Sequence, residues 1–267
     1  PLDHLVSSLV GTVTFRDLHR RILVNTVDLE SGAQVLWGLP GLDDVPVADA
    51  VFASCALPGL FPPRAIRGRT SVDGAVVETL PLRLAAAAGR GPIVAVNLNA
   101  MGPADVVREE AGPLGFASTY IRGLEVVMLT QNLDRLRSWH RPSLVLVQPR
   151  VAHVPMFAFD RADELVDEGR RATLEALDGL GTTLAHLPPG VHPRRAVRVV
   201  VDRDRCVGCG ACALWAPTVF RMDETGKAET VAPVHRWSPV DTTYVAHCPT
   251  RAIGVVPADE RRVEKTA

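Results

Sequence analysis

The sequence predicts two domains in series, an α/β layered domain followed by a small α+β domain. Three observations lead to this prediction. Strand-like and helix-like segments alternate over the first part of the chain, a proline-rich stretch interrupts them, and four of the five cysteines lie in the last quarter. A chain of 267 residues is long enough for one medium and one small domain.

The composition is that of a globular protein. Hydrophobic residues make up 47% and charged residues 22%, which excludes a disordered or fibrous chain. The net charge of −1 and the 5% aromatic content argue against a nucleic-acid binder. No stretch approaches the roughly 18 to 20 apolar residues of a transmembrane segment, so we expect a soluble protein. The chain begins with Pro1 and shows no leader pattern, which suggests a fragment or a processed product.

A proline-rich stretch separates the two domains. Residues 187–195 contain three prolines and one glycine, which favour extended, unpacked backbone. We therefore predict the first domain over residues 1–186, a linker over 187–195, the second domain over 196–257 and a charged tail over 258–267.

In the first domain, the β-rich run over 22–29 ends at a turn and can pair with a strand at 35–37 as a hairpin. Because strands then alternate with helices, we expect a largely parallel sheet. The later elements are a helix over 47–56, a strand over 93–97, a helix over 120–139, a strand over 143–147 and a helix from an Asp160 N-cap to about Leu177.

The second domain begins with a strand over 196–201 that leads into the cysteines. The Asp223–Gly226 segment is a turn between two β-rich arms. A short helix starts at Ser238, ends near Cys248, and precedes a last strand over 253–256.

The cysteines of this domain have the spacing of an iron–sulfur site. Three form a C-x2-C-x2-C run on one bend, which suits the corners of an iron–sulfide cube, and the fourth precedes Pro249. Gly208 and Gly210 let the backbone wrap with its N–H groups pointing inward. We therefore predict four ligands of one cluster: Cys206, Cys209, Cys212 and Cys248.

Two alternatives accompany this interpretation. Structural zinc prefers two separated C-x2-C pairs, and a continuous triplet is a poor match to that pattern. His247 adjoins the fourth cysteine, where we expect a surface residue rather than a ligand. The position of a further cysteine in two-cluster proteins is Ala216, so one cluster is expected.

Residues 196–257 resemble a single-cluster bacterial ferredoxin, through the cysteine motif and the Asp-rich lead-in over 201–206. The resemblance implies a [4Fe–4S] cluster, with [3Fe–4S] as the form left after loss of one iron. It also implies electron transfer from a ferredoxin reductase to an acceptor such as a cytochrome P450 monooxygenase. Thiolate chemistry of this kind needs reducing surroundings, so we expect a cytoplasmic location.

Asp73 is the candidate catalytic residue of the first domain. It ends a short strand, and Gly74 allows a tight turn that holds the carboxylate at the C-terminal edge of the strand. Binding and catalytic sites of α/β sheets usually lie at this edge. Such a carboxylate can activate a serine hydroxyl. The alternative is a solvated Asp-Gly turn without catalytic function.

Three segments resemble patatin-like phospholipases: the strand end at 28–32, the run over 53–63 and the Asp73-Gly74-Ala75 turn. The resemblance covers about residues 10–180 and implies hydrolysis of lipid acyl esters by a Ser–Asp dyad with Asp73 as its aspartate. The family nucleophile lies in G-x-S-x-G, and no serine here has a glycine two positions before it. We therefore expect the chain to hold the aspartate of the dyad in a domain that is truncated at its N-terminus and lacks the nucleophile segment. Cys55 is expected to be a small packing residue.

Three functions follow from these predictions. The first is electron transfer by a ferredoxin module fused to a hydrolase portion that lacks its serine. The second is lipid acyl hydrolysis by a longer protein, with the cluster as a structural or redox-regulatory element. The third is a non-catalytic lipid-binding or scaffold protein.

Overall fold

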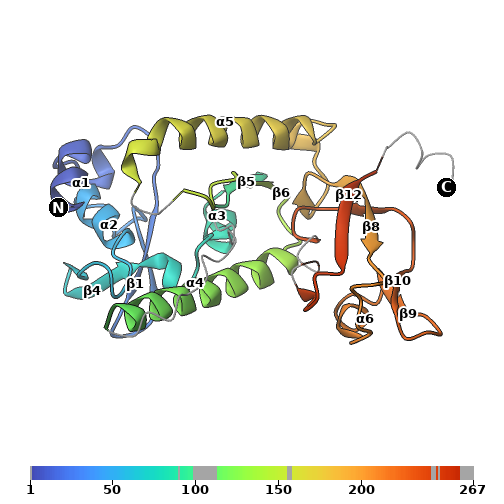
Figure 1. Ribbon diagram of the computed structural model, residues 1–267. Helices are drawn as coiled ribbons and strands as arrows, with labels where there is room; N and C mark the ends of the chain where they lie inside the picture. The colour runs from blue at the N-terminus through green and yellow to red at the C-terminus, as the bar shows by residue number, and fades with distance from the viewer. Residues whose placement is uncertain are drawn as a thin grey trace. The chain divides into compact units, whose positions relative to one another are not determined.

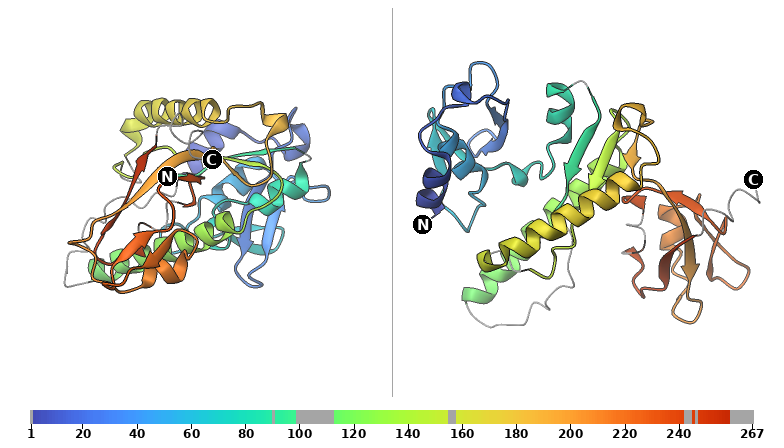
Figure 2. Two further views of the ribbon diagram at one scale, coloured as in Figure 1. Left: turned by 90° about the vertical axis from the view of Figure 1, so that its right-hand side faces the viewer. Right: turned by 90° about the horizontal axis from the view of Figure 1, so that it is seen from above.

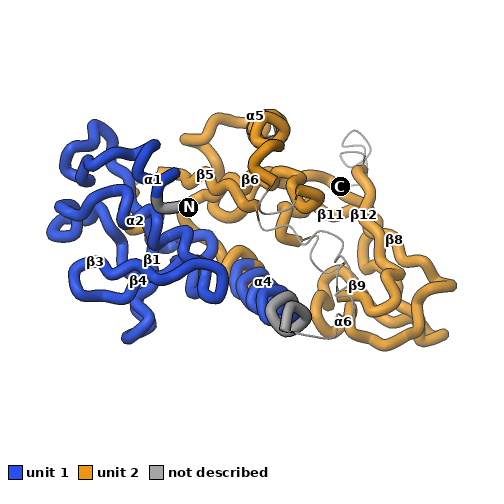
Figure 3. Tube along the Cα trace, turned by 60° about the vertical axis from the view of Figure 1, so that its left-hand side comes forward, with its two compact units in different colours: residues 1–84, 103–132 blue, residues 85–102, 133–267 orange. Residues whose placement is uncertain are grey.

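A computed structural model describes residues 2–89, 91–98, 113–154, 158–241, 245 and 247–258. Its internal contacts divide the chain into two compact units, coloured separately in Figure 3. Unit 1 comprises residues 1–84 and 103–132, and unit 2 comprises residues 85–102 and 133–267. The helices and strands of both units are labelled in Figure 1.

Unit 1 is built on a four-stranded antiparallel sheet in the order β2-β1-β4-β3. The predicted hairpin is confirmed, because β1 and β2 pair with Val24 opposite Trp37. β4 lies on the other side of β1 and brings Asp73 opposite Thr26. The strand bounds are β1 Val24–Asp28, β2 Gln34–Trp37, β3 Arg64–Ile66 and β4 Arg69–Asp73.

Helix α2 packs against this sheet and forms the core of unit 1. Ala50 and Ala53 are fully buried, and their small side chains allow the helix to approach the strands closely. Trp37 is also fully buried, and its indole N–H donates to the Thr26 hydroxyl at 2.8 Å. The helical elements of this part are α1 Leu2–Val10, the 3-10 turn Phe15–Asp17, α2 Val47–Ser54, the 3-10 turn Gly74–Val76 and α3 Leu82–Ala88, which crosses into unit 2.

Unit 2 begins with a parallel sheet in the order β5-β6-β7. Every residue of β6 is buried, which explains its uninterrupted apolar sequence. Helix α5 packs on it through Ala172 and Ala176, and Figure 2 shows this helix as one straight element beside the strands. The bounds are β5 Ile93–Val96, α4 Pro113–Arg137, β6 Leu144–Val147, α5 Ala162–Asp178, the 3-10 turn Leu184–His186 and β7 Val191–His192; α4 starts in unit 1.

Two details differ from the sequence predictions. The largely parallel sheet holds for β5-β6-β7 but is wrong for unit 1, where all neighbouring strands pair antiparallel. The β1–β2 turn is tight, and the Gly32 N–H closes it on the Asp28 carbonyl at 2.8 Å. Asp160 is not the N-cap of α5. It lies in a preceding 3-10 turn, Phe159–Arg161, and Arg161 occupies the cap position without a capping hydrogen bond from its side chain.

The stretch predicted as an unpacked linker is packed. Val191 and His192 form β7 beside β6, and both side chains are buried. The His192 ring shares a hydrogen bond of 2.8 Å between Nε2 and the Pro188 carbonyl. Only Pro193 and Arg194 separate β7 from the next strand.

The C-terminal module, residues 195–258, contains a three-stranded sheet in the order β11-β8-β12 and a β9–β10 hairpin. Phe220 and Trp237 are the large side chains of its core. The predicted first and last strands and the hairpin are confirmed. The predicted helix after Ser238 lies partly outside the described residues, as does the tail from residue 259 on. The bounds are β8 Arg195–Val201, α6 Ala211–Trp215, β9 Phe220–Met222, β10 Ala228–Thr230, β11 His235–Trp237 and β12 Ile253–Pro257.

Across the described ranges, no helix combines the length and the apolar character that crossing a membrane requires.

Candidate functional site

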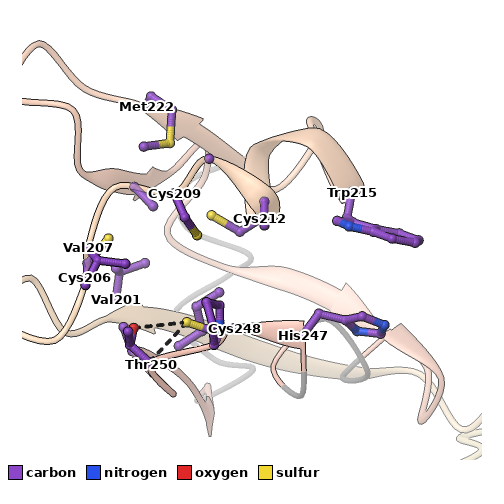
Figure 4. Close-up of a pocket in the computed structure, with 16 residues that line it drawn as sticks. Val201, Cys206, Val207, Cys209, Cys212, Trp215, Met222, His247, Cys248 and Thr250 are labelled. Atoms are coloured by element: carbon purple, nitrogen blue, oxygen red, sulfur yellow. Dashed lines mark hydrogen bonds between the residues drawn. The ribbon is translucent and has the colours of Figure 1, made fainter.

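The four cysteines predicted as ligands line one pocket of the C-terminal module. Figure 4 shows Cys209 and Cys212 facing Cys248 across this pocket, with Cys206 beside them. All four thiols are free of disulfide bonds. Three come from the loop and the start of α6, and the fourth comes from the segment before β12. The fold therefore brings together residues that are distant in sequence.

The cysteine loop depends on two glycines with left-handed backbone. Gly208 has φ +70° and Gly210 has φ +73°, a region that other L-residues rarely adopt. Gly210 is also the N-cap of α6, so its conformation turns the loop into the helix that carries Cys212. A Cβ on Gly208 would lie 2.4 Å from the Gly226 carbonyl, whereas one on Gly210 would meet open space.

The β9–β10 turn packs against the back of this loop. Its Asp223 carboxylate accepts hydrogen bonds from the backbone N–H groups of Thr225 and Lys227, both at 2.9 Å. Arg203, which precedes the loop, contacts the same carboxylate at 2.6 Å. The Lys227 backbone N–H foremost, then the Thr225 hydroxyl and Arg203, hold the pKa of Asp223 well below its usual range. The Lys227 ammonium in turn donates to the Cys206 carbonyl.

Cys248 is held by the chain that follows it. The Ala252 N–H donates to its sulfur at 3.2 Å, and the Thr250 hydroxyl lies 3.6 Å from it. Burial disfavours the thiolate, but these hydrogen bonds outweigh burial and lower the pKa of Cys248. Burial raises the pKa of the Cys212 thiol, and the neighbouring Cys206 and Cys209 add to that effect.

One side of the pocket faces solvent. Cys209 is exposed, and Val207 and Trp215, which also line the pocket, are 64% and 58% exposed. Figure 4 shows the Trp215 ring facing the His247 ring, and the ring centroids are 5.3 Å apart. A protein that docks here can come close to the cysteines.

The thiols suit a cluster better than a single ion. Structural zinc requires four ligands within about 2.3 Å of one point. Within the described ranges, no three His, Cys, Asp or Glu side chains converge on one ion in that way. The cysteines instead surround a pocket (Figure 4), as expected where each thiolate binds a different iron of a cube.

The Asp73 site has a different character. The Asp73 carboxylate accepts a hydrogen bond from Ala75 N–H at 2.9 Å, and its own N–H donates to Ala56 at 3.1 Å. Burial raises the pKa of Asp73, against the opposing effect of the Ala75 bond. Burial and then the Asp73 charge raise the pKa of Cys55, so this thiol lies near the carboxylate.

The nearby serines have other contacts or none. The Ser54 hydroxyl donates to the Asn25 carbonyl at 2.9 Å, and the buried Ser71 hydroxyl has no hydrogen-bond partner among the residues that the structure describes. Across the described ranges, neither donates to Asp73. The turn itself is tight, because a Cβ on Gly74 would lie 2.4 Å from the Asn25 amide nitrogen.

In comparisons with known proteins, the two parts of the chain match different families. The family model for the 4Fe-4S single cluster domain matches residues 199–255. The ferredoxin soy of Streptomyces griseus is 41% identical over 58 residues, which are 21% of this chain and 89% of that protein. Through this module, the chain belongs to the single-cluster ferredoxins. A ferredoxin of Thermococcus litoralis is 51% identical over 35 residues, 13% of this chain and 59% of that protein.

The part before the ferredoxin module contains a patatin-like phospholipase domain, whose family model matches residues 6–86. An uncharacterised NTE family protein of Mycobacterium tuberculosis is 24% identical over 197 residues, 66% of this chain and 32% of that protein. The chain thus spans about a third of the length of this relative.

The sequence predictions missed Lys227, Gly226 and Arg203 as supports of the cysteine loop. One signal was present: Lys227 is one of only two lysines in an arginine-rich chain and directly follows the hairpin turn. Nothing in the spacing indicated that this turn would contact the loop.

Proposed function

We propose that the ferredoxin module passes single electrons through a [4Fe–4S] cluster held by Cys206, Cys209, Cys212 and Cys248. The observation that carries this proposal is the meeting of these four thiols around one pocket with a solvent-facing side. When bound, the cluster would supply the one-electron chemistry. [3Fe–4S] is the form expected after loss of one iron.

The protein residues have separate parts in this function. Gly208 and Gly210 shape the loop, and the Ala252 N–H stabilises the thiolate of Cys248. The exposed apolar side chains of Val207 and Trp215, which line the pocket, give a redox partner close access to the site. We propose a ferredoxin reductase as donor and an oxidised acceptor protein, with a cytochrome P450 monooxygenase as the acceptor to test.

Anaerobic reconstitution with iron and sulfide tests this function. The loaded protein should be brown, absorb at about 400 nm and bleach on reduction with dithionite. Each of C206S, C209S, C212S and C248S should lower iron and sulfide content and alter the spectrum. The matched control is C55S, which should leave both unchanged. A colourless wild type, or a C248S protein identical to wild type, would refute the proposal.

A second candidate function rests on the patatin-like part. We propose that residues up to about 186 are part of a lipid acyl-hydrolase domain with Asp73 as the dyad aspartate. The half-buried Asp73 carboxylate and its raised pKa support a role as base for a serine supplied by a preceding G-x-S-x-G segment.

This candidate requires a protein that includes such a segment. In that protein, Asp73→Asn should abolish p-nitrophenyl ester cleavage, because the amide cannot accept the serine proton. Asp43→Asn, which removes the charge that pairs with Arg16 at 3.0 Å, is the control and should retain activity. Equal activity of D73N and wild type would exclude Asp73 from the reaction. Lipid binding without turnover in the wild type would favour a scaffold instead.

A further inference from the structure

Lys227 connects the β9–β10 hairpin to the cysteine loop. Its ammonium donates to the Cys206 carbonyl, so the side chain reaches the first cysteine of the motif. Its backbone is fixed on both sides of the turn: its N–H donates to the Asp223 carboxylate at 2.9 Å, and its carbonyl accepts from Asp223 N–H at 2.8 Å. The side chain therefore starts from a rigid base.

The Lys227 charge is not neutralised by a nearby carboxylate. Two acids near Lys227 in sequence are paired with other cations, Asp223 with Arg203 at 2.6 Å and Glu229 with Arg221 at 2.6 Å. Within the described ranges, Lys227 has no ion pair with an Asp or Glu. Its side chain is half-buried, so solvent screens the charge less than it screens an exposed arginine. A full positive charge thus lies against the backbone of Cys206.

Close packing keeps the ammonium at this place. The Gly226 carbonyl lies where a Cβ of Gly208 would be, so the turn and the loop touch directly beside Lys227. Ala228, the next residue, lines the cysteine pocket and is buried. If the turn moved away from the loop, Ala228 would no longer close this side of the cysteine pocket.

We propose that Lys227 is a positioning residue that fixes the Cys206 segment of the loop and raises the reduction potential of the site. This inference rests on the proposed electron-transfer function. Adding one electron from an external reductant adds one negative charge to the site, and a nearby fixed cation stabilises that state more than the oxidised one.

The experiment compares midpoint potentials of the reconstituted full chain by dye-mediated titration. Lys227→Met keeps the aliphatic stem and removes the charge, so its potential should be more negative than that of wild type. Lys227→Arg restores the charge and should return the potential toward wild type. The matched control is Arg221→Met in the same hairpin: it removes one cation too, but Arg221 is 66% exposed and paired with Glu229 at 2.6 Å. Its potential should shift less.

Iron and sulfide content separates the possible failures. If wild type itself binds no cluster, the proposed function is wrong. If wild type is loaded and K227M has the potential of wild type or of R221M, the role of Lys227 is wrong. Should K227M load poorly, K227R still decides, because the proposal requires normal loading and a potential near wild type. A poorly loaded K227R protein would contradict it. The K227M shift should also persist in high salt, because the charge is partly buried.

Discussion

The cysteine site and the Asp73 site differ in how much of their chemistry this chain supplies. The ferredoxin module contributes four thiols, the glycines that shape their loop and a hairpin turn that supports it, all within about sixty residues. The Asp73 turn contributes one carboxylate, a supporting N–H and a neighbouring thiol, but no serine that donates to it within the described ranges.

The difference shows which kind of functional site a short segment of sequence can form by itself. A cluster site needs several identical ligands that one loop and one nearby segment can present. The proposed dyad needs two unlike groups from separate elements, and among the described residues we find only the carboxylate. The predictions below test whether the first site is as self-contained, and the second as incomplete, as this comparison implies.

The largest effect is expected from loss of a cluster ligand. Cys212→Ser should destabilise the loaded module by about 4 kcal/mol, because the connection from Cys212 to Cys248 no longer restricts the unfolded chain. Hydrogen exchange read by mass spectrometry should show faster exchange in β8 and β12 and no change in β1 and β4. Faster exchange in both regions would mean that the two sites are not independent.

The two loop glycines should respond unequally to alanine. Both substitutions force alanine into a left-handed conformation, which costs about 1–2 kcal/mol. Gly208→Ala also places a Cβ 2.4 Å from the Gly226 carbonyl, while Gly210→Ala meets open space. Urea denaturation of the loaded protein should therefore rank G208A as clearly less stable than G210A. Equal stabilities would contradict the close contact between turn and loop.

At the Asp73 site we expect a small gain in stability from Asp73→Asn. The pKa of Asp73 is raised in the folded state, so folding favours the protonated form; that contribution is complete below the unfolded pKa and is lost as pH rises through the folded pKa. The charged group thus opposes folding at neutral pH. The melting temperature of D73N should exceed that of wild type at pH 7, and the difference should vanish in acid. A lower value at pH 7 would show that the carboxylate has a stabilising partner.

The smallest effect concerns two arginines of the ferredoxin module. Arg221→Ala breaks an ion pair on the exposed hairpin face, and such pairs typically contribute about 0–1 kcal/mol. Arg203→Ala breaks a pair that joins the cysteine loop to the hairpin turn. Melting curves should change little for R221A and more for R203A. The reverse order would place the important contact outside the loop.

The sequence predicts the parts of this structure that depend on short-range patterns. The hairpin at Val24–Trp37, the strand at Ile93–Val96 and the convergence of four cysteines all follow from residue type and spacing. Contacts between separate segments were not predictable in this way. The packing of β7 beside β6 and the reach of Lys227 to Cys206 depend on tertiary placement, which local composition does not encode.

The packed junction before β8 limits how electrons can be delivered. A carrier on a long flexible tether can swing between donor and acceptor and search a wide volume around its anchor. Here two residues join β7 to β8, and Arg195 binds Glu175 of α5 at 2.8 Å. The short junction leaves the module little free length over which to swing, and we therefore expect redox partners to reach it by diffusion.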